Sequence, residues 1–220
     1  MFELILIRHG ETEFNRAERM QGSQDSPLTE KGQSEARRLG EAMRKFCGPI
    51  DQWYVSPQGR VRQTSAIIRS ELDGVPDEMV HSEIVEIRCG DWEGLQRSEI
   101  PAEELKRVHL STDTAYPNGE SIMDVCARCE NFLADWKSAL PPDFSGNDGA
   151  LHRTVVVSHG NLIRCMGGVL SGLGPDFAVR AMKNNTAVSR FFTRERDFFF
   201  RMLSWNDTGH LQGGNPFFSI

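Results

Sequence analysis

The stretch LILIRHGETEFN, residues 4–15, decides the fold. It opens with an unbroken apolar run, which predicts a buried β-strand over Phe2–Arg8. The run breaks directly into Arg8, His9 and Gly10, and two adjacent cationic side chains are unusual at the end of a buried strand. Ligands of open α/β sheets bind at the carboxyl ends of the strands. The sequence therefore indicates a ligand site at Arg8 and His9.

A second stretch, TVVVSHGN at residues 154–161, has the same layout: an apolar strand, then His159 and Gly160, then a polar turn. Three more strands are predicted over Trp53–Ser56, Ala187–Thr193 and Phe198–Trp205, with helical periodicity between many of the strands. This alternation predicts an α/β fold with right-handed crossover connections. His159 is thereby predicted to end a strand in the same way as His9.

Two segments have the periodicity of amphipathic helices that cover a sheet. Their apolar positions are Ala36, Leu39, Met43 and Phe46 in the first, and Ile122, Val125, Cys129, Phe132, Leu133, Trp136 and Leu140 in the second. At 220 residues the chain is expected to form one domain, 1–220. Residues 88–119 are less periodic and contain turn-forming residues, which predicts a lid or insertion over the site. The Pro- and Gly-rich segment Pro141–Arg153 is predicted to be an exposed loop.

The composition argues against several classes of function. There are 25 Lys and Arg against 31 Asp and Glu, a net charge of −6, so neither nucleic acid nor an anionic membrane is expected as a partner. No segment approaches the ~18–20 apolar residues of a membrane span, and the N-terminus does not have the pattern of a signal peptide. The expected location is the cytoplasm.

Metal and redox chemistry are not expected. The five cysteines are odd in number and scattered, which differs from a disulfide framework, so they are expected to be reduced. Cys126 and Cys129 form a CxxC motif without a second CxxC or a nearby pair of histidines, and packing is the favoured interpretation. The chain has no HExxH motif, no pair of histidines at helical spacing and no aspartate cluster suited to two metals.

Two further motifs carry charged residues in turns. SPQGRVRQT at 56–64 places Arg60 and Arg62 after a Ser-Pro turn, and EIRCGDWEG at 86–94 adds carboxylates in a glycine-containing loop. The chain also contains RHGET (8–12), Asn15, QGSQDSPLTEKG (21–32), NGES (118–121), SHGNLIR (158–164) and SWNDTGHL (204–211). The order of all these motifs along the chain resembles that of the histidine phosphatase superfamily, in its small-phosphatase branch. The resemblance runs nearly end to end. It implies the phosphoglycerate-mutase-like fold, a three-layer sandwich with a mostly parallel central sheet flanked by helices.

The resemblance also implies roles for particular residues. His9 matches the nucleophile, a neutral imidazole that forms a phosphohistidine which water later hydrolyses. Arg8 and Arg60 match the donors that hold the phosphoryl oxygens, and His159 matches a further donor to them. Glu86 matches the proton donor and acceptor, because the family pattern places its acid at the first residue of ExxxGxWEG. The neighbouring acids Glu83, Asp91 and Glu93 are the alternatives.

Other positions match the family less specifically. Contacts to the phosphate or to the rest of the substrate are expected for Asn15, Gln21, Gly22, Gly160 and Asn161. Some charged residues are expected to widen the positive field or to pair with surface acids, namely Arg62, Arg88 and Arg164. His81, His109 and His152 lie in no motif and are interpreted as surface or structural residues. The family often has a tail similar to NDTGHL, but no chemical role follows for His210.

The resulting hypothesis is a metal-independent phosphomonoesterase that acts on a small phosphate ester without a cofactor. The first alternative is a phosphoglycerate mutase, which returns the phosphoryl group to a second hydroxyl. The resemblance favours the phosphatase, because cofactor-dependent mutases of this family tend to be longer between the acid-bearing loop and the second histidine. The other alternative is an inactive protein that binds phosphorylated ligands. The sequence leaves the identity of the ester and the oligomeric state open.

Overall fold

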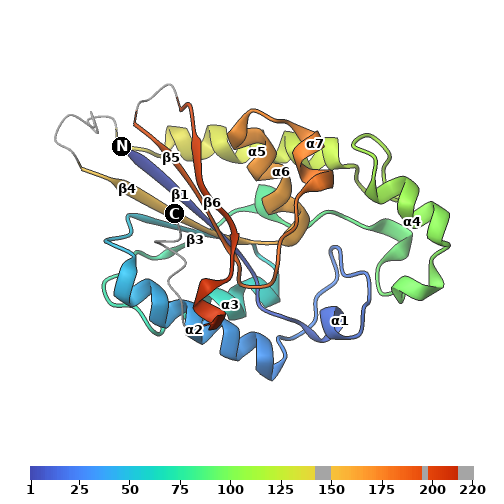
Figure 1. The fold of residues 1–220 in the computed structure, drawn as a ribbon, viewed down its shortest axis with the longest axis horizontal. Helices are drawn as coiled ribbons and strands as arrows, with labels where there is room; N and C mark the ends of the chain where they lie inside the picture. The colour runs from blue at the N-terminus through green and yellow to red at the C-terminus, as the bar shows by residue number, and fades with distance from the viewer. Residues whose placement is uncertain (142–149, 195–197, 213–220) are drawn as a thin grey trace.

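The computed structural model describes residues 1–141, 150–194 and 198–212. It contains a six-stranded sheet in the order β3-β2-β4-β1-β5-β6 (Figure 1). The strands are β1 (Phe2–Arg8), β2 (Gln52–Val55), β3 (Glu78–Val80), β4 (His152–Ser158), β5 (Val188–Thr193) and β6 (Arg201–Asp207). The first four run parallel, and β5 and β6 are antiparallel additions at one edge. The expected mostly parallel α/β sheet is confirmed.

Helices cover both faces of this sheet and make three layers (Figure 1). Alternate residues of β1 supply the two cores: Leu4 and Leu6 pack in the cluster that includes α5 and α6, whereas Ile5 and Ile7 pack in the cluster that includes α2 and α3. The helices on the two faces are α2 (Glu30–Phe46) and α3 (Gly59–Arg69) on one, and α5 (Ile122–Ser138), α6 (Gly160–Ser171) and α7 (Pro175–Arg180) on the other. Because β1 is buried on both faces, its residues 4–7 form an unbroken apolar run.

The parallel register sets the edge at which the histidines lie. Strand β1 pairs with β4 from Phe2↔His152 to Arg8↔Ser158, and β2 pairs with β4 in the same direction. The carboxyl ends of β1, β2 and β4 therefore meet at one edge. The short helices α1 (Glu13–Arg16) and α4 (Ala102–His109) lie beyond this edge (Figure 1).

Several predicted boundaries were wrong. Strand β3 was not predicted, because it has three residues, partly exposed, at the sheet edge. The last strand begins at Arg201 and not at Phe198, whose positive φ of 55° interrupts extended backbone. The predicted loop ends before His152, because Arg153 enters β4 and pairs with buried Glu3 at 2.9 Å. Residues 142–149 of that loop lie outside the described residues.

The two amphipathic helices are confirmed with one exception. Phe46, the last residue of α2, is 40% exposed and does not continue the buried face. Leu140 is buried just beyond the end of α5. The segment expected to act as a lid contains the 3₁₀ turns η2 (Gly90–Trp92) and η3 (Arg97–Glu99) as well as α4. Two further 3₁₀ turns are η1 (Ser82–Ile84) and η4 (Gly209–Gln212).

In the described part of the chain, no helix combines the length and the apolar character that crossing a membrane requires. All five cysteines are free thiols, and Cys126, Cys129 and Cys165 are buried where α5 meets α6.

Candidate active site

A cavity of about 570 Å³ opens at the carboxyl edge of the parallel strands. Its walls come from the end of β1, the 15–22 segment, the start of α3, the segment that includes α4, and the helices α6 and α7 with the residues after them. The lining residues are Arg8, His9, Asn15, Arg19, Met20, Gln21, Gly22, Arg60, Glu86, Cys89, Arg97, His109, Leu110, Tyr116, Asn161, Arg164, Val179 and Met182. The site is thus assembled from distant parts of the sequence.

His9 follows β1 and its tautomer is fixed by the backbone. Its Nδ1 lies 2.8 Å from the carbonyl oxygen of Gly10, and a carbonyl can only accept, so Nδ1 carries the proton. Burial and the charges of Arg8 and Arg60 hold the pKa of His9 well below its usual value, so the ring is neutral at physiological pH. The other ring nitrogen, Nε2, is therefore unprotonated and carries a lone pair.

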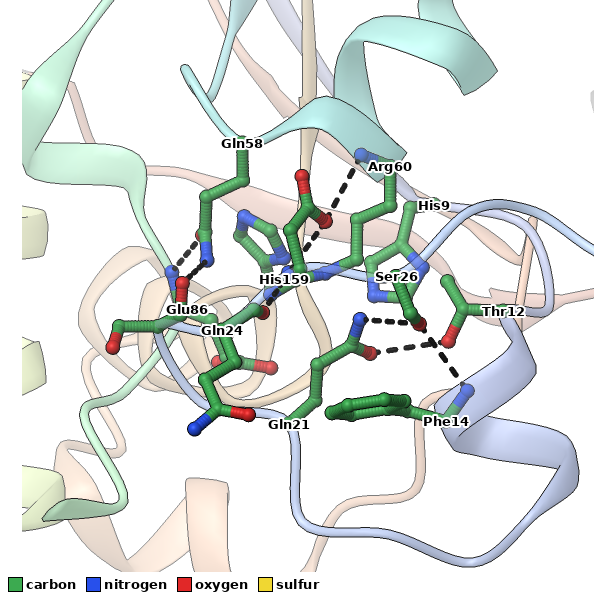
Figure 2. Close-up of polar contacts among 12 residues, drawn as sticks. His9, Thr12, Phe14, Gln21, Gln24, Ser26, Gln58, Arg60, Glu86 and His159 are labelled. Carbon is green, nitrogen blue, oxygen red and sulfur yellow. Dashed lines mark hydrogen bonds and ion pairs between the residues drawn. The ribbon is translucent and has the colours of Figure 1, made fainter. Parts of the chain in front are cut away.

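His159 lies across from His9, with ring centroids 5.4 Å apart (Figure 2). Its Nε2 is 2.8 Å from the hydroxyl oxygen of Ser56, whereas its buried Nδ1 has no hydrogen-bond partner in the described chain. Burial, followed by the charge of Arg60, holds the pKa of His159 well below its usual value. Ser56 does more than shape its turn, because it is the partner that fixes one side of this ring.

Arg60 is buried at the start of α3 and its terminal nitrogens hold the 22–25 loop. Nη1 donates to the carbonyl of Gln24 at 2.8 Å and to Asp25 at 3.1 Å, and Nη2 donates to the carbonyl of Gly22 at 3.0 Å (Figure 2). Its Nε is buried without a partner in the described residues. Arg60 therefore combines a fixed position with one unused donor.

Arg8 is anchored in a similar way. Its Nη1 donates to the carbonyl of Lys183 at 2.5 Å, and its buried Nε has no partner among the described residues. Buried donors are normally satisfied in folded proteins. Arg8 and Arg60 line the cavity, whereas His159 is fully buried and does not line it. Unpartnered nitrogens on these three residues, which lie near His9, mark a place prepared for an acceptor-rich ligand.

Glu86 is the one carboxylate among the residues that line the cavity. Its Oε1 accepts from the backbone N–H groups of Ile87 at 2.9 Å and Leu162 at 3.3 Å, and its Oε2 accepts from that of Asn161 at 3.3 Å. Leu162 and Asn161 belong to the first turn of α6, so the side chain caps this helix. Its backbone N–H donates to Gln58 (Figure 2).

The three alternative acids have other partners and do not line the cavity. Asp91 accepts from Asn118, Glu93 accepts from Ser23 and from the backbone of Cys89, and Glu83 accepts from Asn131. Of the acids considered from the sequence, the structure places Glu86 alone against the cavity.

Four of the five weaker candidates line the cavity, namely Asn15, Gln21, Gly22 and Asn161. Asn15 Oδ1 accepts from the backbone of Thr12 and from Asn185, which leaves its amide nitrogen available to a ligand. Gln21 is bonded to Thr12 and Ser26 (Figure 2). Gly160 does not line the cavity; a Cβ there would lie 3.3 Å from Arg8 Nε.

The backbone conformation and the close packing at position 22 require glycine. Its φ is +53°, in the left-handed region, and a Cβ would lie 2.3 Å from a carboxylate oxygen of Glu93. Its carbonyl accepts from Arg60 and Gln58, so the backbone itself builds this wall of the site.

The remaining arginines of the sequence motifs separate into two groups. Arg62 pairs with Glu78 at 3.1 Å and Arg88 with Glu120 at 3.7 Å, and neither lines the cavity. Arg164 lines it.

His109, which the sequence suggested to be a surface or structural residue, lines the cavity, because the end of α4 brings it there. Sequence reasoning missed Arg19, Tyr116 and Met182, which lie in no motif. Arg97 was predicted only as part of the lid over residues 88–119, and it lines the cavity.

The other histidines lie away from the cavity. His81 contacts Asp135 at 3.2 Å, and His152 is buried at the start of β4. His210 is buried, its Nε2 is 3.2 Å from Thr186 Oγ1, and burial lowers its pKa to about 4. Thr186 in turn donates its backbone N–H to the carbonyl of His9 at 3.3 Å, so the tail supports the strand end that carries His9.

No group of three or more His, Cys, Asp or Glu side chains in residues 1–141, 150–194 and 198–212 has the arrangement of a metal site. The positive groups around His9 are Arg8 and Arg60.

Residues 4–208 match the model of the histidine phosphatase superfamily (branch 1). A probable phosphoglycerate mutase (GpmB) of Enterobacter sp. (strain 638) is 32% identical over 200 residues, which cover 89% of this chain and 86% of that protein.

Solved structures of phosphatases share the fold. A mycobacterial glucosyl-3-phosphoglycerate phosphatase in complex with VO3 superimposes with a TM-score of 0.78 at 26% identity, covering 93% of this chain and 98% of that one. The Entamoeba histolytica phosphoserine phosphatase in complex with 3-phosphoglyceric acid gives 0.77 at 28% identity, covering 96% of this chain and all (100%) of that one. The match over nearly the whole length shows that this chain belongs to branch 1 of the histidine phosphatase superfamily.

Proposed function

We propose that the protein is a phosphomonoesterase that transfers the phosphoryl group of a small ester to His9 and then to water. One observation carries the proposal: a neutral imidazole with its lone pair on Nε2 lies beside buried nitrogens of Arg8, Arg60 and His159 that have no partner among residues 1–141, 150–194 and 198–212. A tetrahedral anion supplies the acceptors that these nitrogens lack.

In the first step His9 Nε2 attacks phosphorus and the bond to the leaving oxygen breaks. Arg8 and Arg60 hold the phosphoryl oxygens, where charge must be stabilised during transfer. In this reaction the Ser56 hydroxyl donates to Nε2 of His159, so that Nδ1 of the same ring carries a proton and donates to the phosphoryl group. This assignment uses the contact of 2.8 Å between Ser56 and His159.

Glu86 gives a proton to the leaving alkoxide, which departs as an alcohol. In the second step its carboxylate removes a proton from the attacking water, the phosphorus–nitrogen bond breaks, and inorganic phosphate leaves with His9 and Glu86 restored. Oε2 is the oxygen assigned to carry this proton, because it accepts one bond of 3.3 Å whereas Oε1 accepts two.

The supporting residues are assigned from their places on the cavity wall. Asn15 presents its free amide to the phosphate, and Gln21, Gly22 and Asn161 contact the ester. Gly160 leaves room for Arg8 at the start of α6. Residues 88–119 form the lid. The five free thiols favour a reducing compartment such as the cytoplasm.

No metal is required in this proposal, because the guanidinium groups supply the positive charge. Turnover is expected to be unchanged after dialysis against EDTA, and a loss that Zn²⁺ or Mg²⁺ restores would contradict the metal-independent mechanism.

A phosphoglycerate mutase is the second candidate, and the name of the relative at 32% identity favours it. The names of the two phosphatase structures favour hydrolysis. Incubation with 3-phosphoglycerate separates the two, with inorganic phosphate and 2-phosphoglycerate measured in the same sample. We expect phosphate, and formation of 2-phosphoglycerate without phosphate release would overturn the choice.

A protein that binds phosphorylated ligands without chemistry is the third candidate. A brief chase with substrate is expected to label the protein stoichiometrically with an acid-labile, base-stable phosphate that His9→Ala abolishes. Inertness toward a panel of phosphate esters would favour the binding protein. The same panel identifies the ester.

A further inference from the structure

Gln58 lies at the N-cap position of α3, but its side chain accepts no hydrogen bond from the first turn of that helix. Asp25 takes this place and accepts from the backbone N–H of Arg60 at 3.2 Å. An N-cap side chain commonly bonds to its own helix. The amide of Gln58 is instead directed toward other segments, so its contacts need an explanation beyond the capping of α3.

The amide of Gln58 joins two walls of the site. Its Oε1 accepts from the backbone N–H of Glu86 at 3.0 Å (Figure 2). Its Nε2 donates to the carbonyls of Gly22 and Ser23, each at 3.2 Å. A backbone N–H can only donate and a carbonyl can only accept, so these three partners fix which end of the amide is the oxygen. The side chain therefore ties the loop that carries the acid to the segment 22–23.

These contacts lead on to the groups proposed to hold the phosphoryl oxygens. The carbonyl of Gly22 accepts from Gln58 and also from Nη2 of Arg60 at 3.0 Å. The hydroxyl oxygen of Ser56 lies 2.8 Å from Nε2 of His159 and 3.5 Å from Oε1 of Gln58. The amide of Gln58 is thus separated from each of these two phosphate-binding side chains by a single group.

Gln58 does not itself reach the space that a substrate would occupy. It is half-buried and is not one of the described residues that line the cavity. Arg60 has further bonds of its own, from Nη1 to Gln24 and Asp25. The Glu86 carboxylate is held by the first turn of α6, whereas its backbone N–H is held by Gln58. Loss of Gln58 should therefore displace the acid more than it disturbs the phosphate site.

We propose that Gln58 is a positioning residue, which sets where the proton donor Glu86 lies relative to a phosphoryl group held by Arg60 and His159. The proposal rests on the proposed function for the reaction that Gln58 assists. The steps assisted are the proton transfer from Glu86 to the leaving oxygen and the later transfer from water to Glu86. A residue that acts through the acid has a distinct signature, because its loss slows esters that need the proton and largely spares those that do not.

Steady-state kinetics with two esters test this role. Gln58→Met keeps the length of the side chain and removes its hydrogen bonds. Gln33→Met, at an exposed position of α2 outside the cavity, is the matched control and should leave both rates unchanged. For Gln58→Met we expect kcat to fall about tenfold on sn-glycerol 3-phosphate, the factor that a hydrogen bond of this kind supplies. On 4-nitrophenyl phosphate the fall should be less than about threefold, with KM nearly unchanged for both esters.

A double-mutant cycle shows whether the effect passes through the acid. The same substitution is made in the chain with Glu86→Gln, where the loss on glycerol 3-phosphate should shrink to the small factor found with the nitrophenyl ester. Two changes that act through one group are not additive, whereas a general loss of structure would appear in both backgrounds. Equal losses on the two esters, an undiminished loss in the Glu86→Gln chain, or a rise in KM alone would overturn the positioning role.

Hydrogen exchange followed by NMR tests the contact without turnover. The backbone amide of Glu86 should exchange at least about tenfold faster in Gln58→Met than in the native chain, because it loses its acceptor. The amides of β4 should keep their native rates, which shows that the sheet is intact. Failure of the native chain to hydrolyse either ester would contradict the proposed function. Unchanged exchange of the Glu86 amide would instead show that Gln58 does not hold the acid-bearing loop.

Discussion

His9 and His159 end neighbouring parallel strands, yet their rings are held differently. The Nδ1 of His9 is tied to a backbone carbonyl, which fixes its tautomer, whereas Nε2 of His159 contacts a hydroxyl that can either donate or accept. A backbone contact suits a nucleophile whose lone pair must always be available. A hydroxyl contact suits a ring that changes its hydrogen bonds while the phosphoryl group is transferred. The different roles proposed for the two rings follow from this difference.

Ser56 should affect the chemical step more than binding. Ser56→Ala removes the partner of His159 Nε2, and a lost hydrogen bond of ~1 kcal/mol corresponds to a decrease in kcat of somewhat under tenfold. Steady-state kinetics with 4-nitrophenyl phosphate measures kcat and KM separately, and Ser70→Ala, an exposed serine, is the control. A rise in KM with kcat unchanged would contradict this positioning role.

Glu86 should matter most for poor leaving groups. Glu86→Gln cannot donate a proton to an alkoxide, and general acid catalysis contributes about 10²–10⁴-fold, so we expect a loss of that order on an alkyl phosphate. The loss on 4-nitrophenyl phosphate should be much smaller, because nitrophenolate leaves without a proton. Glu83→Gln, which alters a nearby acid outside the cavity, is the control. Equal losses on both esters would show that Glu86 is not the proton donor.

At the scale of elements, the sequence correctly predicted the helices and strands whose position depends on the burial of apolar side chains. The buried strand β1 and the apolar stripe of α5 were predicted correctly, because residues such as Leu4, Ile5 and Phe132 have no stable position other than the core. The edge strand β3 was missed, since it pairs on one side only and its side chains are partly exposed. The start of β6 was misplaced because its aromatic residues suggested a strand where Phe198 adopts a positive φ.

The packing of α5 on the sheet gives a stability prediction. Phe132 is fully buried, and its ring packs edge-on against that of Tyr54 in β2, with ring centroids 5.2 Å apart. Phe132→Ala should lower the free energy of unfolding by ~3–5 kcal/mol, through lost burial and the cavity that remains. Urea denaturation measures the change, and Met123→Ala, at a position of the same helix that is 53% exposed, should change it by less than ~0.5 kcal/mol. Similar values for the two variants would contradict the placement of α5.

At the scale of the whole molecule, the site depends on which strand ends meet. The sequence predicted that Arg8 ends a strand and that His9 and His159 follow strands, and the parallel pairing of β1 with β4 places them at one edge. It predicted a lid over residues 88–119, which contains Arg97 and His109, but did not assign either side chain to the cavity wall. Their positions depend on how residues 88–119 cross the edge, and no local pattern encodes that path. Motif residues next to strands were therefore predictable, whereas the wall built by the covering segment required the three-dimensional structure.

The buried histidines make the free energy of unfolding of the whole molecule depend on pH. His210 lies away from the cavity, so its contribution can be measured without changing the site. In the unfolded chain a histidine has a pKa of about 6.5, whereas burial lowers that of folded His210 to about 4. Between these values the unfolded state binds a proton that the folded state does not, so stability falls as pH falls through this window. From pH 7.5 to 5.0 His210 alone should cost ~2 kcal/mol, since one pKa unit corresponds to about 1.4 kcal/mol. Urea denaturation at both pH values should show a smaller decrease in His210→Gln than in the native chain by that amount. An equal decrease in both proteins would mean that His210 is not held neutral in the fold.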